Sequence, residues 1–288
     1  MTSTSTSTIL VTGGTGTLGR LVTPLLRDTD HHVRVLTRHG RAPEGDAGGA
    51  GGAGGAGGAG GAGGVEYVAA DLLKDEGIDT ALDGAEIVLH LAGAAKGDDV
   101  ATRNLVRAAT RSGVRDAVRH LVYISVIGAD RIPLGYPRAK LGAELAVAQS
   151  GLPWTTLRAA QFHDLVLTVV RAMAKLPVVP VPGGLRLQPV DTRDVADRLV
   201  ELTLGEPAGR VADLAGPKVY GLGELSRGYL WARGKKRPTM PLRIPGKVGR
   251  VYRAGENLTL VGADLGRRTW EDFLAERVSG DGAHVRRR

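Results

Sequence analysis

A glycine-rich segment near the start of the chain constrains its fold more than any other feature. The segment reads Thr12-Gly13-Gly14-Thr15-Gly16-Thr17-Leu18-Gly19 and directly follows a strand-like run at 9–12. An apolar stripe typical of a helix follows it, at Leu18, Leu21, Val22, Leu25 and Leu26. Glycine permits a tight turn, a close approach to a ligand and close packing of helix on strand. The segment therefore predicts a strand–turn–helix unit whose helix N-terminus can receive an anion.

This context favours a dinucleotide-binding turn over a glycine-rich turn without a ligand. We expect its residues to hold a pyrophosphate, namely Gly13, Thr15, Gly16, Thr17, Leu18 and Gly19. The second strand ends in Thr37-Arg38-His39-Gly40-Arg41, with no acidic residue before Glu44. Because a guanidinium can hold a 2′-phosphate bidentately, Arg38 predicts NADP(H) in preference to NAD(H). Arg20 and Arg41 are either helpers in this contact or ordinary surface residues.

Short strand-like runs alternate with helical patterns along the first half of the chain. This alternation predicts an α/β fold with a doubly wound parallel sheet of the Rossmann type. We expect a disordered tail at 1–8, an NAD(P)-binding domain at 9–160, and a substrate-binding cap at 161–288 interleaved with the sheet. Within the first domain, residues 43–64 predict a flexible surface loop, since 48–64 repeat Gly-Gly-Ala. The expected strands are 9–12, 33–37, 65–68, 87–92, 121–125 and 154–158, and the expected helices are 100–111, 137–149, 193–204, 222–232 and 268–277.

Composition narrows the classes of function. The chain has no Cys, which excludes disulfides and thiolate metal sites, and no metal-ligand spacing stands out. No apolar run reaches the roughly 20 residues of a membrane span, so we expect a soluble protein. The absence of Cys fits a reducing compartment, and we expect a cytoplasmic location. The net charge is +8, and a segment without acids at 233–253 carries much of it. We interpret that segment as a solvated or substrate-facing surface, with no nucleic acid as partner. The oligomeric state is not predicted.

Three polar residues in the middle of the chain are candidates for chemistry. Ser125 ends the expected fifth strand, and Tyr136 and Lys140 follow at a spacing of four. Tyr and Lys at i and i+4 share a helix face, so an ammonium can favour the phenolate. Ser125 could hold a carbonyl while Tyr136 transfers a proton. Pro137 prefers the first helical turn and leaves open whether Tyr136 is helical or a cap residue. The alternative is a structural Tyr beside a surface Lys.

The chain resembles the short-chain dehydrogenase/reductase superfamily, in its atypical NmrA-like branch. The resemblance rests on the glycine-rich turn, on Ala70-Asp71-Leu72, on Leu91-Ala92-Gly93, on Tyr123-Ile-Ser125 with Tyr136 and Lys140, and on Gln188-Pro-Val-Asp191-Thr-Arg-Asp194-Val-Ala196. It implies that Asp71 lies by the adenine, and that Leu72, Leu91, Ala92 and Gly93 are also cofactor-binding. It also implies that Ser125, Tyr136 and Lys140 are catalytic, with Lys140 binding the ribose.

These observations lead to three expectations of function. The first is an NADP(H)-dependent oxidoreductase that transfers hydride to a carbonyl or quinone-like small molecule. The second is a regulatory protein that senses NADP(H) without turnover, because the NmrA-like branch contains such members. The third is a nucleotide-sugar epimerase or dehydratase, which no signature in the expected cap supports.

Two other places in the sequence attract a functional interpretation. His90, inside the apolar fourth strand, is expected to be a hydrogen-bonded core residue rather than a ligand or a base. Residues 161–164 follow the sixth strand at the edge of the expected site. They either contact substrate or nicotinamide or form an ordinary loop.

Overall fold

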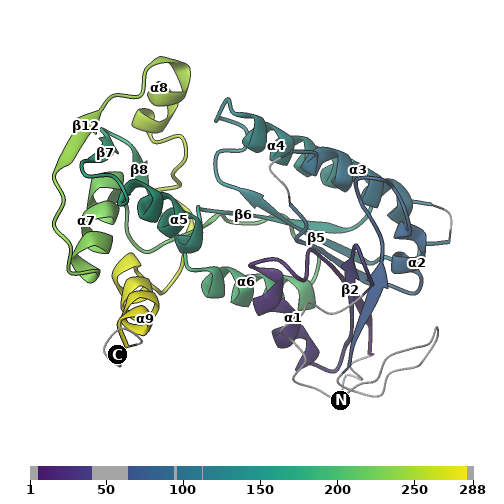
Figure 1. Cartoon of the computed structure of the whole chain (residues 1–288). Helices are drawn as coiled ribbons and strands as arrows, with labels where there is room; N and C mark the ends of the chain where they lie inside the picture. Colours follow the sequence, from purple (N-terminus) through teal and green to yellow (C-terminus); the bar gives the residue numbers. More distant parts are fainter. Residues whose placement is uncertain (1–5, 41–63, 94–95, 112, 284–288) are drawn as a thin grey trace. The chain divides into compact units, whose positions relative to one another are not determined.

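The computed structural model describes residues 6–40, 64–93, 96–111 and 113–283 (Figure 1). The chain forms two compact units, which we describe separately. Unit 1 comprises Met1–Ile124, Ala139–Leu157 and Ala196–Val211. Unit 2 comprises Ser125–Arg138, Arg158–Val195 and Ala212–Arg288. The chain therefore passes between the units several times.

Unit 1 is built on a parallel sheet whose strand order reverses at β1. Its strands run in the order β6-β5-β4-β1-β2-β3, and β9 pairs with β6. The pairings of β1 with both β2 and β4, of β2 with β3, and of β4 with β5 are all parallel. This confirms the predicted doubly wound, Rossmann-type α/β fold. The strands are β1 Thr8–Thr12, β2 His32–Thr37, β3 Val65–Ala69, β4 Ile87–His90, β5 His120–Val126, β6 Trp154–Ala159 and β9 Gly209–Arg210.

Helices cover both faces of this sheet. Figure 1 shows α3 and α4 on one face and α1 and α6 on the other. Such coverage explains why the central strands are apolar on both sides, as in β4, whose four residues are all buried. The helices are α1 Gly19–Arg27, α2 Ile78–Leu82, α3 Asp98–Ala109, α4 Gly135–Ala148 and α6 Thr192–Leu204.

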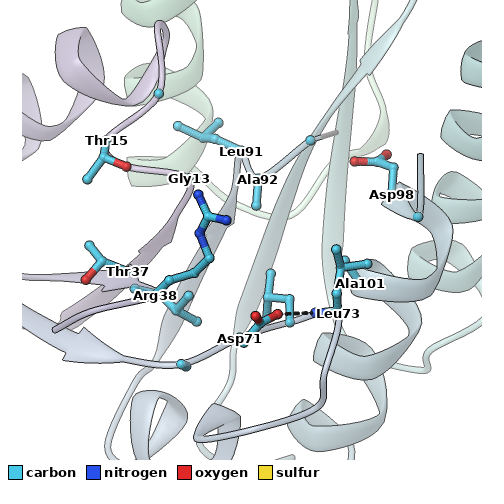
Figure 2. A pocket seen from close by; sticks show the side chains of 16 residues that line it. Gly13, Thr15, Thr37, Arg38, Asp71, Leu73, Leu91, Ala92, Asp98 and Ala101 are labelled. Carbon is cyan, nitrogen blue, oxygen red and sulfur yellow. Dashed lines mark hydrogen bonds between the residues drawn. The ribbon is translucent and has the colours of Figure 1, made fainter. Parts of the chain in front are cut away.

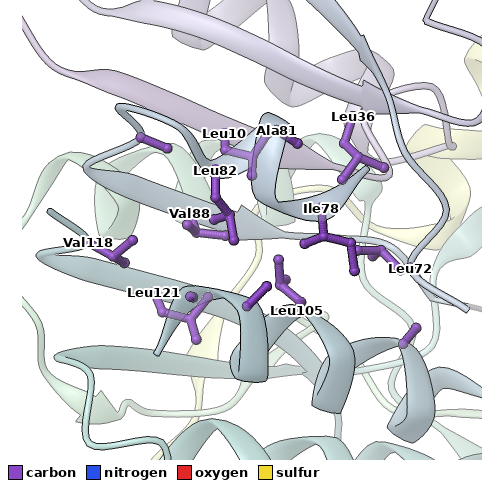
Figure 3. Packing of buried hydrophobic residues seen from close by; sticks show 14 of the residues in the cluster. Leu10, Leu36, Leu72, Ile78, Ala81, Leu82, Val88, Leu105, Val118 and Leu121 are labelled. Carbon is purple, nitrogen blue, oxygen red and sulfur yellow. The ribbon is translucent and has the colours of Figure 1, made fainter. Parts of the chain in front are cut away.

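One hydrophobic core lies between the sheet and the helices α2, α3 and α4, which cover one of its faces (Figure 3). Strand residues Leu10, Val88 and Leu121 contribute to it from three adjacent strands. Helix α3 contributes Leu105 and the small residues Ala101, Ala108 and Ala109. Small side chains at helical spacing let α3 pack closely against the sheet. This packing fixes where α3 begins, and therefore where Asp98 lies.

Unit 2 has its own core, formed by α5, α7 and α9 around Trp270 and Phe273. The interpretation of 161–164 as an ordinary loop is wrong at its end, because α5 begins at His163. The sequence of α5 is rich in Val, and it does not predict a helix because β-branched residues by themselves favour strands. Helix α8 was not expected at all. The elements are α5 His163–Met173, β7 Val179–Pro182, β8 Arg186–Leu187, β10 Leu214–Ala215, β11 Tyr220–Gly221, α7 Leu222–Ala232, β12 Thr239–Leu242, α8 Gly246–Ala254, β13 Asp264–Leu265 and α9 Trp270–Ala283.

The glycine–alanine tract at 48–64 lies almost entirely outside the described residues, so the structure does not test the predicted loop. The strands on its two sides, β2 and β3, pair directly in parallel.

Among the helices that the structure describes, none combines the length and the apolar character that crossing a membrane requires.

Candidate cofactor-binding and active site

The glycine-rich turn forms a backbone cradle at the carboxyl end of β1. Gly13 has a φ of +71°, and a Cβ there would lie 2.6 Å from the backbone nitrogen of Ala92. A Cβ at Gly19 would overlap the carbonyl oxygen of Gly13 and the backbone of Gly14. The N–H of Gly16 donates to the carbonyl of Gly13 at 3.0 Å and closes the turn. Only glycine fits at positions 13 and 19, because backbone atoms occupy the space that a side chain would need there.

The N-terminus of α1 is left open by the protein's own side chains. Leu18 precedes the helix with helical dihedral angles and makes no side-chain capping hydrogen bond. In the described structure no acidic residue occupies the first turn of α1. The N–H groups of Arg20, Leu21 and Val22 already donate to the carbonyls of Gly16 and Leu18. A ligand would therefore meet the partial positive charge of the helix end together with the backbone of the turn before it. This helix end therefore suits the pyrophosphate that the turn predicts.

A pocket of about 360 Å³ opens beside this turn, within unit 1 (Figure 2). It brings together the carboxyl ends of β1, β2, β3 and β4, where ligands of doubly wound sheets bind. Nine of the residues predicted to bind the cofactor line it: Gly13, Thr15, Gly16, Arg38, Asp71, Leu72, Leu91, Ala92 and Gly93. Thr17, Leu18, Gly19 and Lys140 are not in its lining. Residues that the sequence did not single out also line it: Leu36, Thr37, Ala70, Leu73, Gly97, Asp98 and Ala101.

Arg38 is the cation of this pocket. It is exposed at the end of β2, and Figure 2 shows its guanidinium among the lining residues. Within the described part of the chain, Arg38 makes no ion pair. Arg20, in contrast, donates to the carbonyl of Thr15 at 3.0 Å and so braces the turn. Arg41 lies outside the described residues.

Asp71 stabilises the loop that forms another wall of the pocket. Its Oδ1 accepts hydrogen bonds from the backbone N–H of Leu73 at 2.9 Å and of Lys74 at 3.2 Å. An Asp that bonds its own backbone two and three residues on is a local turn device. The carboxylate is therefore fixed in place, and it presents Leu72 and Leu73 to the pocket.

Lys140 lies in a buried polar cluster beside Gly93. Its Nζ is 3.2 Å from Asp98 Oδ2 and donates to the carbonyl of Ile124 at 3.2 Å. The ring of Tyr123 lies under it, 4.9 Å away, and the Tyr123 hydroxyl donates to Asp98 Oδ2 at 2.9 Å. Burial lowers the pKa of Lys140, and the nearby Asp98 carboxylate opposes that shift. The lysine thus has a buried counter-ion that the sequence pattern did not reveal.

The three proposed catalytic residues belong to different units. Lys140 belongs to unit 1, whereas Ser125 and Tyr136 belong to unit 2. The Ser125 side chain is buried, and its Oγ has no hydrogen-bond partner among the described residues. Tyr136 is 41% exposed and lies in the first turn of α4, which begins at Gly135. Tyr136 is thus a helical residue and not a cap residue. Pro137 does not prevent this, since proline is tolerated in the first turn of a helix.

His90 is a hydrogen-bonded core residue, as predicted. Its Nδ1 lies 2.6 Å from Thr12 Oγ1 and its Nε2 lies 2.9 Å from Thr102 Oγ1. Its ring stacks on Tyr123 with 5.4 Å between the centroids. Burial, helped by the charge of Lys140, lowers the pKa of His90 from its ordinary value of 6.5 to about 3. The imidazole is therefore neutral and ties β1 and β4 to α3.

This pKa predicts a pH dependence of stability. Because folding holds the pKa of His90 below its unfolded value, the stabilisation is complete above pH 6.5 and is lost as the pH falls towards 3. His90→Asn should reduce the acid sensitivity of the unfolding free energy, by up to about 1.4 kcal/mol per pH unit in this window. Urea unfolding at pH 7 and pH 4.5 measures it, with His32→Asn, on the exposed start of β2, as control. Equal acid sensitivity of parent and His90→Asn would contradict the prediction.

The most informative residue that the sequence reasoning missed is Asp98. It opens α3 directly after the loop that follows β4, and its neighbour Asp99 forms a surface pair with Arg103. The signal in the sequence was an acidic pair at a helix start beside the end of a parallel strand. That signal is indistinguishable from ordinary helix capping until the position of Lys140 is known.

The model of a family described as NAD(P)H-binding matches residues 13–204, well over half of the chain. The photosystem II assembly factor Ycf39 of Trieres chinensis is 25% identical over 268 residues, covering 87% of this chain and 78% of that protein.

Two solved structures resemble the whole fold. An NADPH-dependent quinone oxidoreductase from Escherichia coli, complexed with NADPH, has a TM-score of 0.72 at 21% identity, covering 93% of this chain and 99% of that chain. A nucleoside-diphosphate-sugar epimerase from Staphylococcus aureus has a TM-score of 0.73 at 19% identity, with the same coverage. At these identities the likeness shows a shared fold.

Proposed function

The chain belongs to the NAD(P)H-binding family, and we propose that it is an NADP(H)-dependent oxidoreductase that reduces a carbonyl or quinone-like small molecule. The observation that carries the cofactor preference is Arg38. Its guanidinium lines the pocket at the end of β2, where an NAD site would have a carboxylate for the ribose 2′-hydroxyl. With no carboxylate paired to it among the described residues, Arg38 can hold a 2′-phosphate through charge-assisted hydrogen bonds.

Arg38→Asp should therefore reverse or narrow the preference for NADPH. We expect the parent to bind NADPH at least about tenfold more tightly than NADH, and the variant to lose about 1.5–3 kcal/mol of NADPH binding. Isothermal titration with both cofactors measures this. Arg27→Asp, at the exposed end of α1 and outside the pocket, is the matched control and should leave the ratio unchanged. Equal affinities of the parent for the two cofactors would remove Arg38 from its role.

The proposed chemistry divides among three side chains. Bound NADPH supplies a hydride. Ser125 orients the substrate oxygen, and Tyr136 donates the proton that this oxygen acquires. Lys140 binds the cofactor ribose and favours the phenolate form of Tyr136 electrostatically. The Oγ of Ser125 has no hydrogen-bond partner in the part of the chain that the structure describes, and this supports its role, since a buried hydroxyl without a partner is uncommon unless a ligand completes it.

A regulatory protein that senses NADP(H) is the second candidate function. The observation that favours it is the buried pair of Lys140 and Asp98. The Asp98 carboxylate neutralises the Lys140 ammonium, which the catalytic scheme needs in order to favour the phenolate of Tyr136. An epimerase or dehydratase of nucleotide sugars ranks below both, because its support is the likeness of fold alone.

Turnover separates the first two candidates. Anaerobic NADPH consumption is measured with a panel of carbonyl compounds and quinones, in parallel with NADPH binding by titration. An oxidoreductase consumes NADPH with at least one member of the panel and stops when the substrate is exhausted. Tight binding of NADPH without consumption across the panel would reject the oxidoreductase and select the sensor.

A further inference from the structure

An ion pair lies against the Gly93 wall of the pocket. The side chains of Asp98 and Lys140 are 1% and 4% exposed. A Cβ on Gly93 would lie 3.2 Å from Lys140 Nζ and 3.3 Å from Asp98 Oδ1. Both charged groups therefore border the space that glycine leaves vacant at this position. Gly93 and Asp98 also line the pocket, and Figure 2 shows Asp98 at the N-terminus of α3 beside it.

The two oxygens of Asp98 are in different situations. Oδ2 accepts hydrogen bonds from the Tyr123 hydroxyl and from Lys140 Nζ. Oδ1 is buried and has no hydrogen-bond partner among the described residues. A buried carboxylate oxygen without a donor is costly, and native proteins satisfy nearly all such atoms with protein, water or ligand groups. Oδ1 therefore has the capacity for one more donor, on the side of Gly93.

The surroundings of Lys140 make its charge depend on this carboxylate. Burial disfavours the ammonium, while Asp98 and, more weakly, Glu144 favour it. His90 is neutral, so it adds no opposing charge. The titratable and charged groups that face Lys140 come from four elements, namely Asp98 on α3, Tyr123 on β5, His90 on β4 and Glu144 on α4.

We propose that Asp98 is a positioning residue of the cofactor site: its Oδ2 holds the Lys140 ammonium at the Gly93 wall, and its Oδ1 accepts a hydrogen bond from a ribose hydroxyl of the bound cofactor. An ammonium donor beside a carboxylate acceptor matches a vicinal diol, because each hydroxyl both donates and accepts. In NADP(H) the nicotinamide ribose carries this diol, since the adenosine ribose bears the 2′-phosphate. The identity of the ligand rests on the proposed function. The coupling of Asp98 to Lys140 does not, since it exists without a ligand.

The binding experiment compares Asp98→Asn with Asp99→Asn. The two residues are adjacent at the start of α3, but Asp99 pairs with Arg103 on the surface. At pH 7, Asp98→Asn should weaken NADPH binding about tenfold or more, and Asp99→Asn by less than about twofold. Binding of 2′,5′-ADP, which contains the 2′-phosphate but no second ribose, should change by less than about twofold in both variants. Thermal unfolding checks that each variant is folded.

The charge experiment needs no cofactor. Protein labelled with ¹³C at lysine is titrated by NMR, and the Lys140 signal is assigned through Lys140→Arg. In Asp98→Asn the titration midpoint of Lys140 should fall by at least about one pH unit, because burial is no longer opposed. As the pH rises, the NADPH affinity of this variant should therefore begin to decrease at a lower pH than that of the parent.

Gly93→Ala provides a second variant that keeps both charged residues. Its methyl group would lie 3.2 Å from Lys140 Nζ and 3.3 Å from Asp98 Oδ1, so the pair must shift slightly. The methyl group would also fill the space between the pair and the ligand, so NADPH binding should weaken. Three results with Asp98→Asn would each overturn the proposal: NADPH affinity equal to that of the parent, a loss of 2′,5′-ADP binding as large as the loss of NADPH binding, or a titration midpoint of Lys140 equal to that of the parent.

The role of Asp98 and the proposed function fail in distinguishable ways. If Asp98→Asn behaves as expected but the parent turns over no substrate, the oxidoreductase fails and the role of Asp98 stands. If the parent turns over substrate and Asp98→Asn binds NADPH as the parent does, the role of Asp98 fails and the oxidoreductase stands.

Discussion

Tyr136→Phe should lower kcat about 10²–10⁴-fold with the best substrate found, while NADPH affinity stays within about twofold. The change removes one hydroxyl group from an exposed side chain in the first turn of α4, so the fold should be unaffected. A positioned acid acts in the transition state, and its loss therefore appears in kcat rather than in cofactor binding. Steady-state kinetics combined with NADPH titration measures both quantities.

Two further variants sharpen this result. Tyr229→Phe, on α7 against the core of unit 2, is the control and should keep the parent kcat. Lys140→Met should lower both kcat and NADPH affinity, because the ammonium is proposed to serve the phenol and the ribose. If Tyr136→Phe turns over substrate as fast as the parent, Tyr136 is not the acid.

Gly19→Ala should reduce NADPH affinity about 100-fold, which corresponds to about 2.8 kcal/mol. It should also lower the free energy of unfolding by about 3 kcal/mol. The added methyl group would overlap the carbonyl oxygen of Gly13 and the backbone of Gly14. The turn or α1 must then shift, and several backbone N–H groups lose their alignment on the pyrophosphate together.

Gly135→Ala is the matched control for this change. Gly135 is the first residue of α4, as Gly19 is the first residue of α1. Nothing lies within 4 Å of a Cβ placed on Gly135. Alanine there should be neutral or stabilising by up to about 1 kcal/mol, because alanine favours the helix. Titration with NADPH and urea unfolding compare the two variants; equal effects would mean that the close packing at Gly19 does not matter.

Local patterns in the sequence were sufficient to predict the fold class and two parts of the pocket, the glycine-rich turn and Arg38. The strand, the glycine-rich turn and the helix at 9–27 follow from residues that contact one another within one short segment. Arg38 was predicted at the pocket because a parallel strand delivers its last residues to the same edge as its neighbours. Both are short-range inferences, in which spacing along the chain determines position in space.

Other elements could not be inferred in this way. The run at 163–173 is rich in valine and leucine, and its helix is stabilised by packing on α7 and α9 rather than by its own preference. The predicted spacing of Tyr136 and Lys140 on α4 is correct, yet it says nothing about which acid neutralises the lysine. Helix periodicity describes one helix face and is silent about what the face meets.

The sequence by itself therefore determined the class of the sheet, the cradle at Gly13–Gly19 and the cation at Arg38. The alternation of strand and helix patterns indicates a doubly wound sheet, and the other two features follow from residues at the end of a single strand. The tertiary structure alone decided that Lys140 pairs with Asp98, whose position is 42 residues earlier, and that Asp98 keeps one oxygen without a partner among the described residues. The reason is physical: α3 and α4 lie on the same face of the sheet, and the core under them brings the two charges together. No local preference encodes such a long-range contact.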